Sequence, residues 1–150
     1  MDRRRFLLAS LAGALAAPLS TEAQESRKIP RVGILAATSP ALAGHQVDAF
    51  REGLRELGHI EGQNIVIEER WAEGKPERFG HLIADLQRSK VDVIVVASAG
   101  GARAARNAAT ATPVVFVAVT DPIGSGIVGS LARPGGNLTG TSLARIMRER

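Results

Sequence analysis

The sequence has 150 residues, enough for one α/β domain of ordinary size once a targeting segment is set aside. Its formal net charge is only +4, and acidic residues are interleaved with the basic ones, so no basic stripe of the kind that binds nucleic acid is present. Cysteine is absent, which excludes a disulfide framework, a thiolate metal site and a thiol nucleophile within these residues.

The first 23 residues have the pattern of a signal peptide. Three arginines at positions 3–5 precede an apolar run, residues 6–17, that is too short to span a bilayer as a helix. The small residues that follow predict cleavage after Ala23. The arginines resemble a twin-arginine export signal, and the general secretory route remains equally open. Residues 24–30 are then a polar leader that precedes the folded part of an exported protein.

The first predicted elements are a strand, a helix and a second strand. Residues 31–37 are apolar along their length, which is typical of a strand buried on both faces of a parallel sheet. Ser39 in a capping position and Pro40 in the first turn predict the start of a helix, which Gly58 ends. Residues 64–70 predict a second strand with one apolar face, nearer the edge of the sheet.

A second helix is predicted from about Pro76 to Lys90, where apolar side chains recur at helical spacing. Residues 91–96 form the most continuous β-branched run of the chain, which predicts a central strand. The small residues 97–101 predict the loop between this strand and an alanine-rich helix that begins near Ala102.

Residues 114–119 predict a fourth, internal strand, and a short helical stretch interrupted by glycines follows it. Residues 138–143 predict a fifth, weak strand. Strands that alternate with helices imply right-handed crossovers and a doubly wound α/β fold. Because strands one, three and four are the most apolar, the expected order of the parallel sheet is 2-1-3-4-5. The folded lobe then covers residues 31–143, and residues 144–150 are a tail.

A binding site is predicted where the loops after strands one, three and four meet at one edge of this sheet. Hydroxyl groups and backbone N–H groups at helix starts suit a carboxylate or a phosphate, and a nearby acidic side chain suits an ammonium group. Such a set would hold an amino-acid zwitterion, and a phosphate or a simple carboxylate also fits the donors. The predicted ligand-binding residues are Thr38, Ser39, Ser98, Ala99, Gly100, Thr120 and Asp121. The alternative is that these residues only cap helices and form turns.

Motifs for other chemistry are missing from the sequence. It contains no dinucleotide fingerprint, no phosphate loop and no nucleophile elbow, so no nucleotide cofactor and no serine nucleophile are expected. The histidines His45, His59 and His81 lack ligand spacing, so no metal site is expected. Glu68 and Glu69 are neighbours on a strand and should point to opposite faces, which prevents them from acting as an acid–base pair.

Several segments together resemble the N-terminal part of the ABC transporter substrate-binding proteins related to the tryptophan and tyrosine importers. The most specific segment is LARPGGNLTG at residues 131–140. The other matching segments are residues 1–6, 32–35, 50–54, 58–64, 70–74, 113–116 and 121–122. The resemblance implies a type I periplasmic binding protein fold, in which two α/β lobes close on a small solute, often an amino acid. It also implies delivery of that solute to ABC permease subunits in the inner membrane.

The chain departs from this family in its length. Family members continue after the LTG segment into a second lobe, so the resemblance implies that the second lobe is absent here and that half of the cleft is missing. The leading hypothesis is therefore a periplasmic solute-binding subunit, or one lobe of it, without catalysis. The rival hypotheses are a small exported enzyme of flavodoxin-like topology, with a cofactor phosphate in the same crevice, and an inert fragment.

Overall fold

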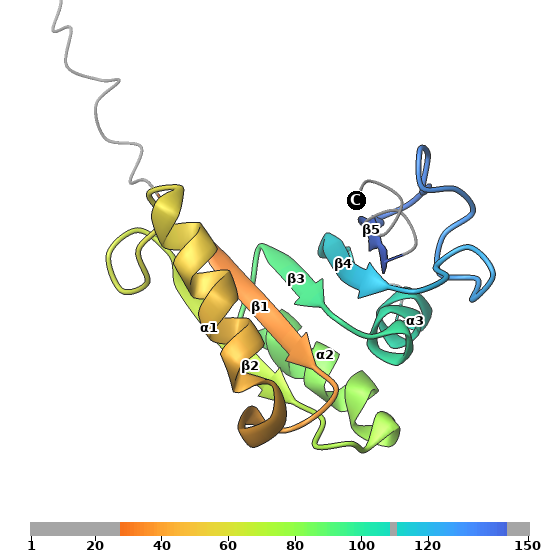
Figure 1. Ribbon diagram of the computed structural model, residues 1–150, viewed down its shortest axis with the longest axis horizontal. Helices are drawn as coiled ribbons and strands as arrows, with labels where there is room; N and C mark the ends of the chain where they lie inside the picture. Colours follow the sequence, from red (N-terminus) through yellow and green to blue (C-terminus); the bar gives the residue numbers. More distant parts are fainter. Residues whose placement is uncertain (1–27, 109–110, 144–150) are drawn as a thin grey trace, which may run out of the picture.

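The computed structural model describes residues 28–108 and 111–143, and Figure 1 shows how their helices and strands are arranged. In chain order the elements are β1 (Arg31–Ala36), α1 (Pro40–Glu56), β2 (Val66–Trp71), the 3₁₀ turn η1 (Pro76–Arg78), α2 (Phe79–Arg88), β3 (Val93–Val96), α3 (Ala99–Asn107), β4 (Val114–Val119) and β5 (Leu138–Ser142). The predicted signal peptide, most of the polar leader and the tail lie outside the described residues. None of the helices in the described part is long and apolar enough to cross a membrane.

The five strands form one parallel sheet in the order β2-β1-β3-β4-β5, which confirms the predicted order. The central strand β3 pairs with β1 on one side and with β4 on the other. Its residues Ile94 and Val96 are fully buried, as their β-branched, apolar run predicts. Strand β2, whose apolar residues are interrupted by charged ones, lies at an edge of the sheet and pairs with a strand on one side only.

Helices α2 and α3 cover one face of the sheet, and α1 lies on the other face over β1 and β2 (Figure 1). The main core lies under α2 and α3. There Ile83 and Leu86 of α2 pack against the sheet residues Leu35, Ile94 and Phe116, all of which are fully buried. Because side chains alternate along a strand, the neighbouring residues of these strands point toward α1 instead.

Two predictions about the segments after the strands were wrong. Helix α3 begins at Ala99 rather than near Ala102, because the Ser98 side chain caps it by accepting a hydrogen bond from the Gly101 N–H at 3.1 Å. After β4 the chain forms a series of turns and no regular helix. Gly126 has a φ of +67°, which is incompatible with a helix at that position.

Candidate functional site

The carboxyl ends of all five parallel strands lie at the same edge of the sheet. From that edge α1 leaves toward one face after β1, and α3 leaves toward the other face after β3. Strands β1 and β3 are direct neighbours, with Leu35 beside Val96. This is the switch point of a doubly wound sheet, where the loops on either side diverge and leave a crevice.

A cavity of about 260 Å³ opens at this switch point. It brings together three of the predicted binding residues, Thr38, Ser98 and Gly100. The connection between β2 and α2 adds residues that sequence reasoning did not assign to the site. The complete lining is Ala37, Thr38, Gly74, Pro76, Phe79, Ser98 and Gly100. We call this the edge cavity, and no charged side chain of the described residues lines it.

The β1–α1 loop contributes Thr38 to the lining of the edge cavity, and Ser39 is the next residue of the loop. The Thr38 carbonyl accepts a hydrogen bond from the Glu73 N–H at 3.0 Å, which holds the loop against the end of β2. The Thr38 hydroxyl makes no hydrogen bond with the described residues. Ser39 has the extended backbone of a helix cap, yet its side chain caps nothing, and the first turn of α1 contains no acidic residue. Both hydroxyls are therefore available to a ligand.

The start of α3 contributes backbone donors. The Ser98 carbonyl accepts from the Ala102 N–H at 3.0 Å, and the Ser98 hydroxyl oxygen accepts from Gly101. The N–H groups of Ala99 and Gly100 belong to the first turn and have no partner inside the helix. Since the Ser98 hydroxyl can still donate its own proton, the edge cavity presents donors and the positive end of a helix dipole. This arrangement suits an anion such as a carboxylate.

Phe79 supplies the apolar wall of the same cavity. It is the first residue of α2 and is almost completely buried, and its ring lies against the start of α3. A Cβ atom built on Gly100 would lie 3.2 Å from the Phe79 ring atom Cε2, so the glycine allows the close approach. The helical spacing of Phe79 predicted a core residue, which it is. No sequence pattern connected Phe79 to the site.

The remaining predicted site residues do not line the edge cavity. Ser39 and Ala99 each flank a residue that does. Thr120 and Asp121 are exposed beyond the end of β4. The Thr120 carbonyl accepts from the Ser142 hydroxyl at 3.2 Å, and the Asp121 carboxylate accepts from the Gly124 N–H at 2.8 Å. Asp121 thus caps a turn, and its pairing with a ligand ammonium group stays a prediction.

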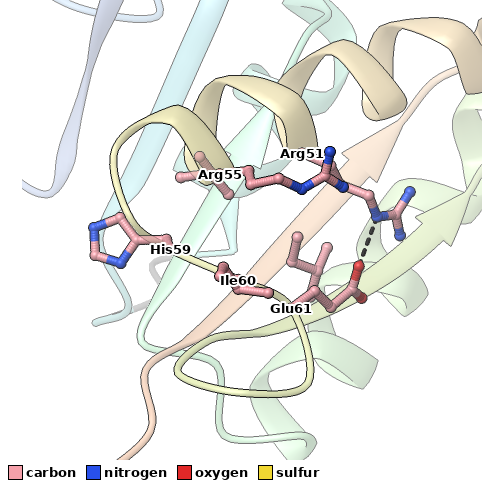
Figure 2. Close-up of a pocket in the computed structure, with 7 residues that line it drawn as sticks. Arg51, Arg55, His59, Ile60 and Glu61 are labelled. Atoms are coloured by element: carbon pink, nitrogen blue, oxygen red, sulfur yellow. Dashed lines mark hydrogen bonds and ion pairs between the residues drawn. The ribbon is translucent and has the colours of Figure 1, made fainter.

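A second polar cavity, of about 240 Å³, lies between the end of α1 and the turn before β2 (Figure 2). Arg51, Arg55, His59 and Glu61 contribute its polar groups. Its arginines already have partners, because Arg51 donates to Glu61 at 2.7 Å and Arg55 pairs with the neighbouring Glu52. None of the predicted binding residues lines this cavity. In the described part of the chain, no three His, Asp or Glu side chains gather as metal ligands.

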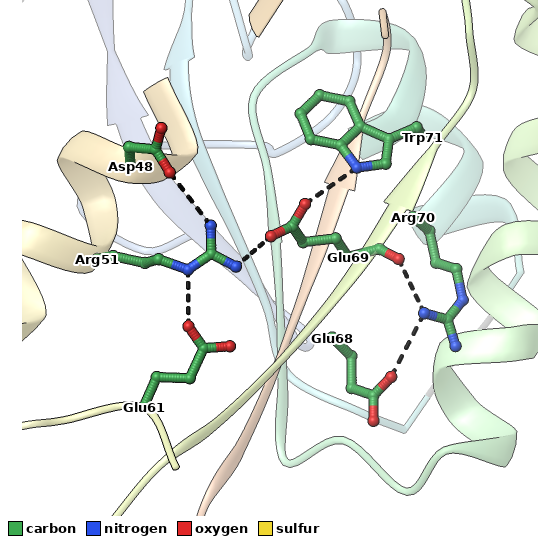
Figure 3. A network of polar contacts seen from close by, with 7 residues as sticks. All are labelled: Asp48, Arg51, Glu61, Glu68, Glu69, Arg70 and Trp71. Carbon is green, nitrogen blue, oxygen red and sulfur yellow. Dashed lines mark hydrogen bonds and ion pairs between the residues drawn. The ribbon is translucent and has the colours of Figure 1, made fainter. Parts of the chain in front are cut away.

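Arg51 is the centre of an ion-pair network that fastens α1 to the edge strand β2 (Figure 3). Its guanidinium contacts Asp48, Glu61 and Glu69, and Glu69 also accepts from the Trp71 indole N–H at 3.0 Å. The hydrogen bond with Glu61 is the main cause of a raised Arg51 pKa. Burial opposes this rise, and the bond with Glu69 adds to it. The network is therefore a structural clamp.

Glu68 points to the other face of β2, as the sequence predicts for neighbours on a strand. It accepts from Arg31 at 2.6 Å, and Arg70 lies 3.4 Å from its second oxygen (Figure 3 shows the Arg70 contact). The adjacent glutamates therefore serve separate ion pairs on opposite faces. They do not form an acid–base pair.

Replacing Arg51 with methionine is expected to lower the free energy of unfolding by roughly 1–2 kcal/mol, because three carboxylates lose a partly buried partner. Arg55→Met is the matched control on the same helix. Its single pair with Glu52 is exposed, so a change of no more than about 0.5 kcal/mol is expected. Urea unfolding measures both variants, and equal effects would show that the clamp contributes nothing.

The comparisons with known proteins agree on one protein family. The sequence pattern of the family described as ABC transporter substrate binding protein matches residues 31–150. The tyrosine-binding protein of Clostridioides difficile (strain R20291) is 32% identical over 118 residues, which are 79% of this chain and 34% of that protein. The chain thus spans about a third of the length of this curated relative.

Several solved structures resemble the fold, and two of them are described here. A conserved domain protein from Vibrio cholerae has a TM-score of 0.70 and 30% identity, and the match covers 77% of this chain and 39% of that one. An ABC domain in complex with L-Trp from Streptococcus pneumonia has a TM-score of 0.68 and 28% identity, with coverage of 75% and 38%. In both cases the chain corresponds to well under half of the longer protein.

Proposed function

Since the chain belongs to the ABC transporter substrate-binding protein family, we propose that it forms one lobe of a receptor that captures an amino acid or a related carboxylate. The observation that carries this proposal is the edge cavity. There two hydroxyl-bearing residues, Thr38 and Ser98, meet the free N–H groups of α3 without an opposing negative charge. Such donors fix a carboxylate, and the Phe79 ring offers an apolar surface for the rest of the ligand.

The relatives support an amino acid as the ligand. One of them is named a tyrosine-binding protein, and one solved structure contains L-Trp. Aromatic amino acids combine a carboxylate with a large apolar group, which is the combination that the edge cavity offers. We therefore place L-tryptophan and L-tyrosine first among the ligands to test.

The same proposal includes the cellular location of the protein and its partner proteins. The leader at residues 1–23 has the pattern of an export signal, and import requires capture of the solute outside the inner membrane. The partners are then ABC permease subunits, to which the loaded receptor delivers its solute. A second lobe, of the kind that the longer relatives have room for, would close over the edge cavity and add to the affinity.

The family is one of binding proteins, which favours capture over catalysis. An enzyme that holds a cofactor phosphate at α3 would use the same donors, so nucleotides and flavin mononucleotide belong in the test as competitors. An inert fragment would melt without cooperativity. The following experiment distinguishes solute capture, a cofactor-binding enzyme and an inert fragment.

Thermal unfolding of the full chain with and without ligand tests the proposal. L-Tryptophan or L-tyrosine at about 100 times its dissociation constant is expected to stabilise the protein by about 2.7 kcal/mol, which raises the melting temperature by several degrees. The methyl ester of the same amino acid lacks the carboxylate and should have a much smaller effect. A shift with a nucleotide alone, or no shift with any amino acid, would contradict the proposal.

A further inference from the structure

The connection between β2 and α2 has a strained backbone where it borders the edge cavity. Two consecutive residues are left-handed, Glu73 with a φ of +55° and Gly74 with a φ of +74°. Glycine adopts this conformation readily, whereas the Cβ atom of a glutamate makes it costly. In the described part of the chain, the other residues with a Cβ atom and a positive φ are Lys90 and Ala118. Strain of this kind persists where the surrounding contacts fix it, often at a functional site.

Two backbone hydrogen bonds fix the strained residues against the β1–α1 loop. The Glu73 N–H donates to the Thr38 carbonyl at 3.0 Å, and the Gly74 N–H donates to the Ala37 carbonyl at 2.8 Å. Successive N–H groups of an extended strand point in opposite directions, so the left-handed backbone lets both donate to one loop. Ala37, Thr38 and Gly74 all line the edge cavity. The strained turn therefore joins two walls of the cavity.

The Glu73 side chain ties the same connection together further along. Its carboxylate accepts a hydrogen bond from the Arg78 guanidinium at 2.7 Å. Arg78 is the last residue of η1 and directly precedes Phe79, the apolar wall of the cavity. Between the two ends of this ion pair lie Gly74 and Pro76, which also line the cavity. The ion pair thus closes a short loop that supplies one side of the edge cavity.

Stability of the fold does not account for the glutamate. The Glu73 and Arg78 side chains are 55% and 38% exposed, and an ion pair this open to water contributes little to folding. The left-handed backbone of a residue other than glycine costs at least as much free energy as such a pair contributes. Glycine at position 73 would avoid that cost. The effect of the ion pair is therefore to restrict the loop rather than to stabilise the protein.

We propose that Glu73 is a positioning residue for the solute. Through its ion pair with Arg78 it holds residues 74–76 in the binding conformation, so that this side of the edge cavity is formed before the solute arrives. A wall that is already ordered does not lose conformational entropy on binding, and the affinity is higher for that reason. This inference rests on the proposed function of the edge cavity.

Hydrogen exchange of the backbone amides tests the loop without any ligand. Glu73→Gly keeps the left-handed backbone and removes the ion pair, so the Gly74 amide of the full chain should exchange about tenfold faster. The melting temperature should stay the same or rise. Lys90→Gly is the matched control, because Lys90 has a φ of +54° but lies before β3, at the opposite edge of the sheet. It should leave the exchange of Gly74 unchanged.

Reversal of the two charges tests the ion pair itself. Glu73→Arg places two arginines across the loop, and Arg78→Glu places two glutamates there. Each single variant should speed the exchange of Gly74 about tenfold. The double variant restores an ion pair with the opposite polarity, so its exchange should return to within about twofold of the original rate. A double variant that exchanges as fast as the single ones would show that the pair does not hold the loop.

Calorimetric titration with L-tryptophan and L-tyrosine then measures the consequence for binding. Glu73→Gly should weaken the affinity about tenfold, whereas Lys90→Gly should leave it unchanged. Unaltered exchange of Gly74 in Glu73→Gly would overturn the positioning role, and so would faster exchange with unaltered affinity. A chain that binds neither amino acid before any substitution would contradict the proposed function instead. The exchange rates of the charge-reversed variants would still decide whether Glu73 and Arg78 hold the loop.

Discussion

Replacing Gly101 with alanine is expected to destabilise the protein by about 1–3 kcal/mol and to weaken solute binding at the same time. The added Cβ would lie 2.6 Å from Cγ2 of Val96 and 2.9 Å from the Ser98 hydroxyl oxygen. Val96 is fully buried in the central strand and cannot move away. Ser98 would have to shift, and its hydroxyl would leave both the cap of α3 and the edge cavity.

Gly80→Ala is the matched control for this substitution. Gly80 is also helical, in α2, but it is exposed and has no atom within 4 Å of its Cβ position. Alanine there should stabilise the protein by about 0.5–1 kcal/mol, because it improves helix propensity without a clash. Urea unfolding of the two variants should give changes of opposite sign. A stabilised Gly101→Ala variant would refute the close packing of α3 against β3.

Replacing Ser98 with aspartate is expected to abolish binding of a carboxylate ligand and to leave the fold intact. Aspartate caps a helix about as well as serine, so α3 should keep its start. The new negative charge would stand beside the bound carboxylate. At a separation of about 4 Å and an effective dielectric constant of about 20, the repulsion is about 4 kcal/mol, or roughly a thousandfold in the dissociation constant.

Ser130→Asp serves as the control with the same change of charge. The Ser130 hydroxyl also accepts backbone hydrogen bonds, from Ala132 and Arg133, but it lies in a turn far along the chain from the edge cavity. Calorimetric titration with L-tryptophan and L-tyrosine should show normal affinity for this variant. If Ser98→Asp and the control bind equally well, the carboxylate does not lie at the start of α3.

The sheet could be predicted from the sequence because burial of strands follows directly from their composition. The β-branched run that contains Ile94 and Val96 identified the central strand, and the interrupted pattern of β2 identified an edge. The crevice between β1 and β3 then followed from the order of the strands. Thr38, Ser98 and Gly100 were predicted to lie together for this reason, and they line one cavity.

Other features depend on contacts that a linear pattern does not contain. The small residues after Val96 predicted a loop as far as Gly101, but the hydrogen bond from the Gly101 N–H to Ser98 lets the helix begin at Ala99. Phe79 has the spacing of a core residue, so its second role at the edge cavity was not visible. The apolar runs of β3 and β4 predicted strands buried on both faces. In the described part of the chain, α2 and α3 cover one face of these strands, whereas α1 lies on the other face over β1 and β2.

The most direct test of the binding site is a titration of the ¹⁵N-labelled chain with L-tryptophan and L-tyrosine, followed by NMR of the backbone amides. The largest shift changes are expected at Thr38, Gly74, Ser98 and Gly100, which surround the edge cavity. The amides of Arg55 and His59 at the second polar cavity should move little. Changes confined to that second cavity, or no changes at saturating amino acid, would contradict the assignment of the site to the start of α3.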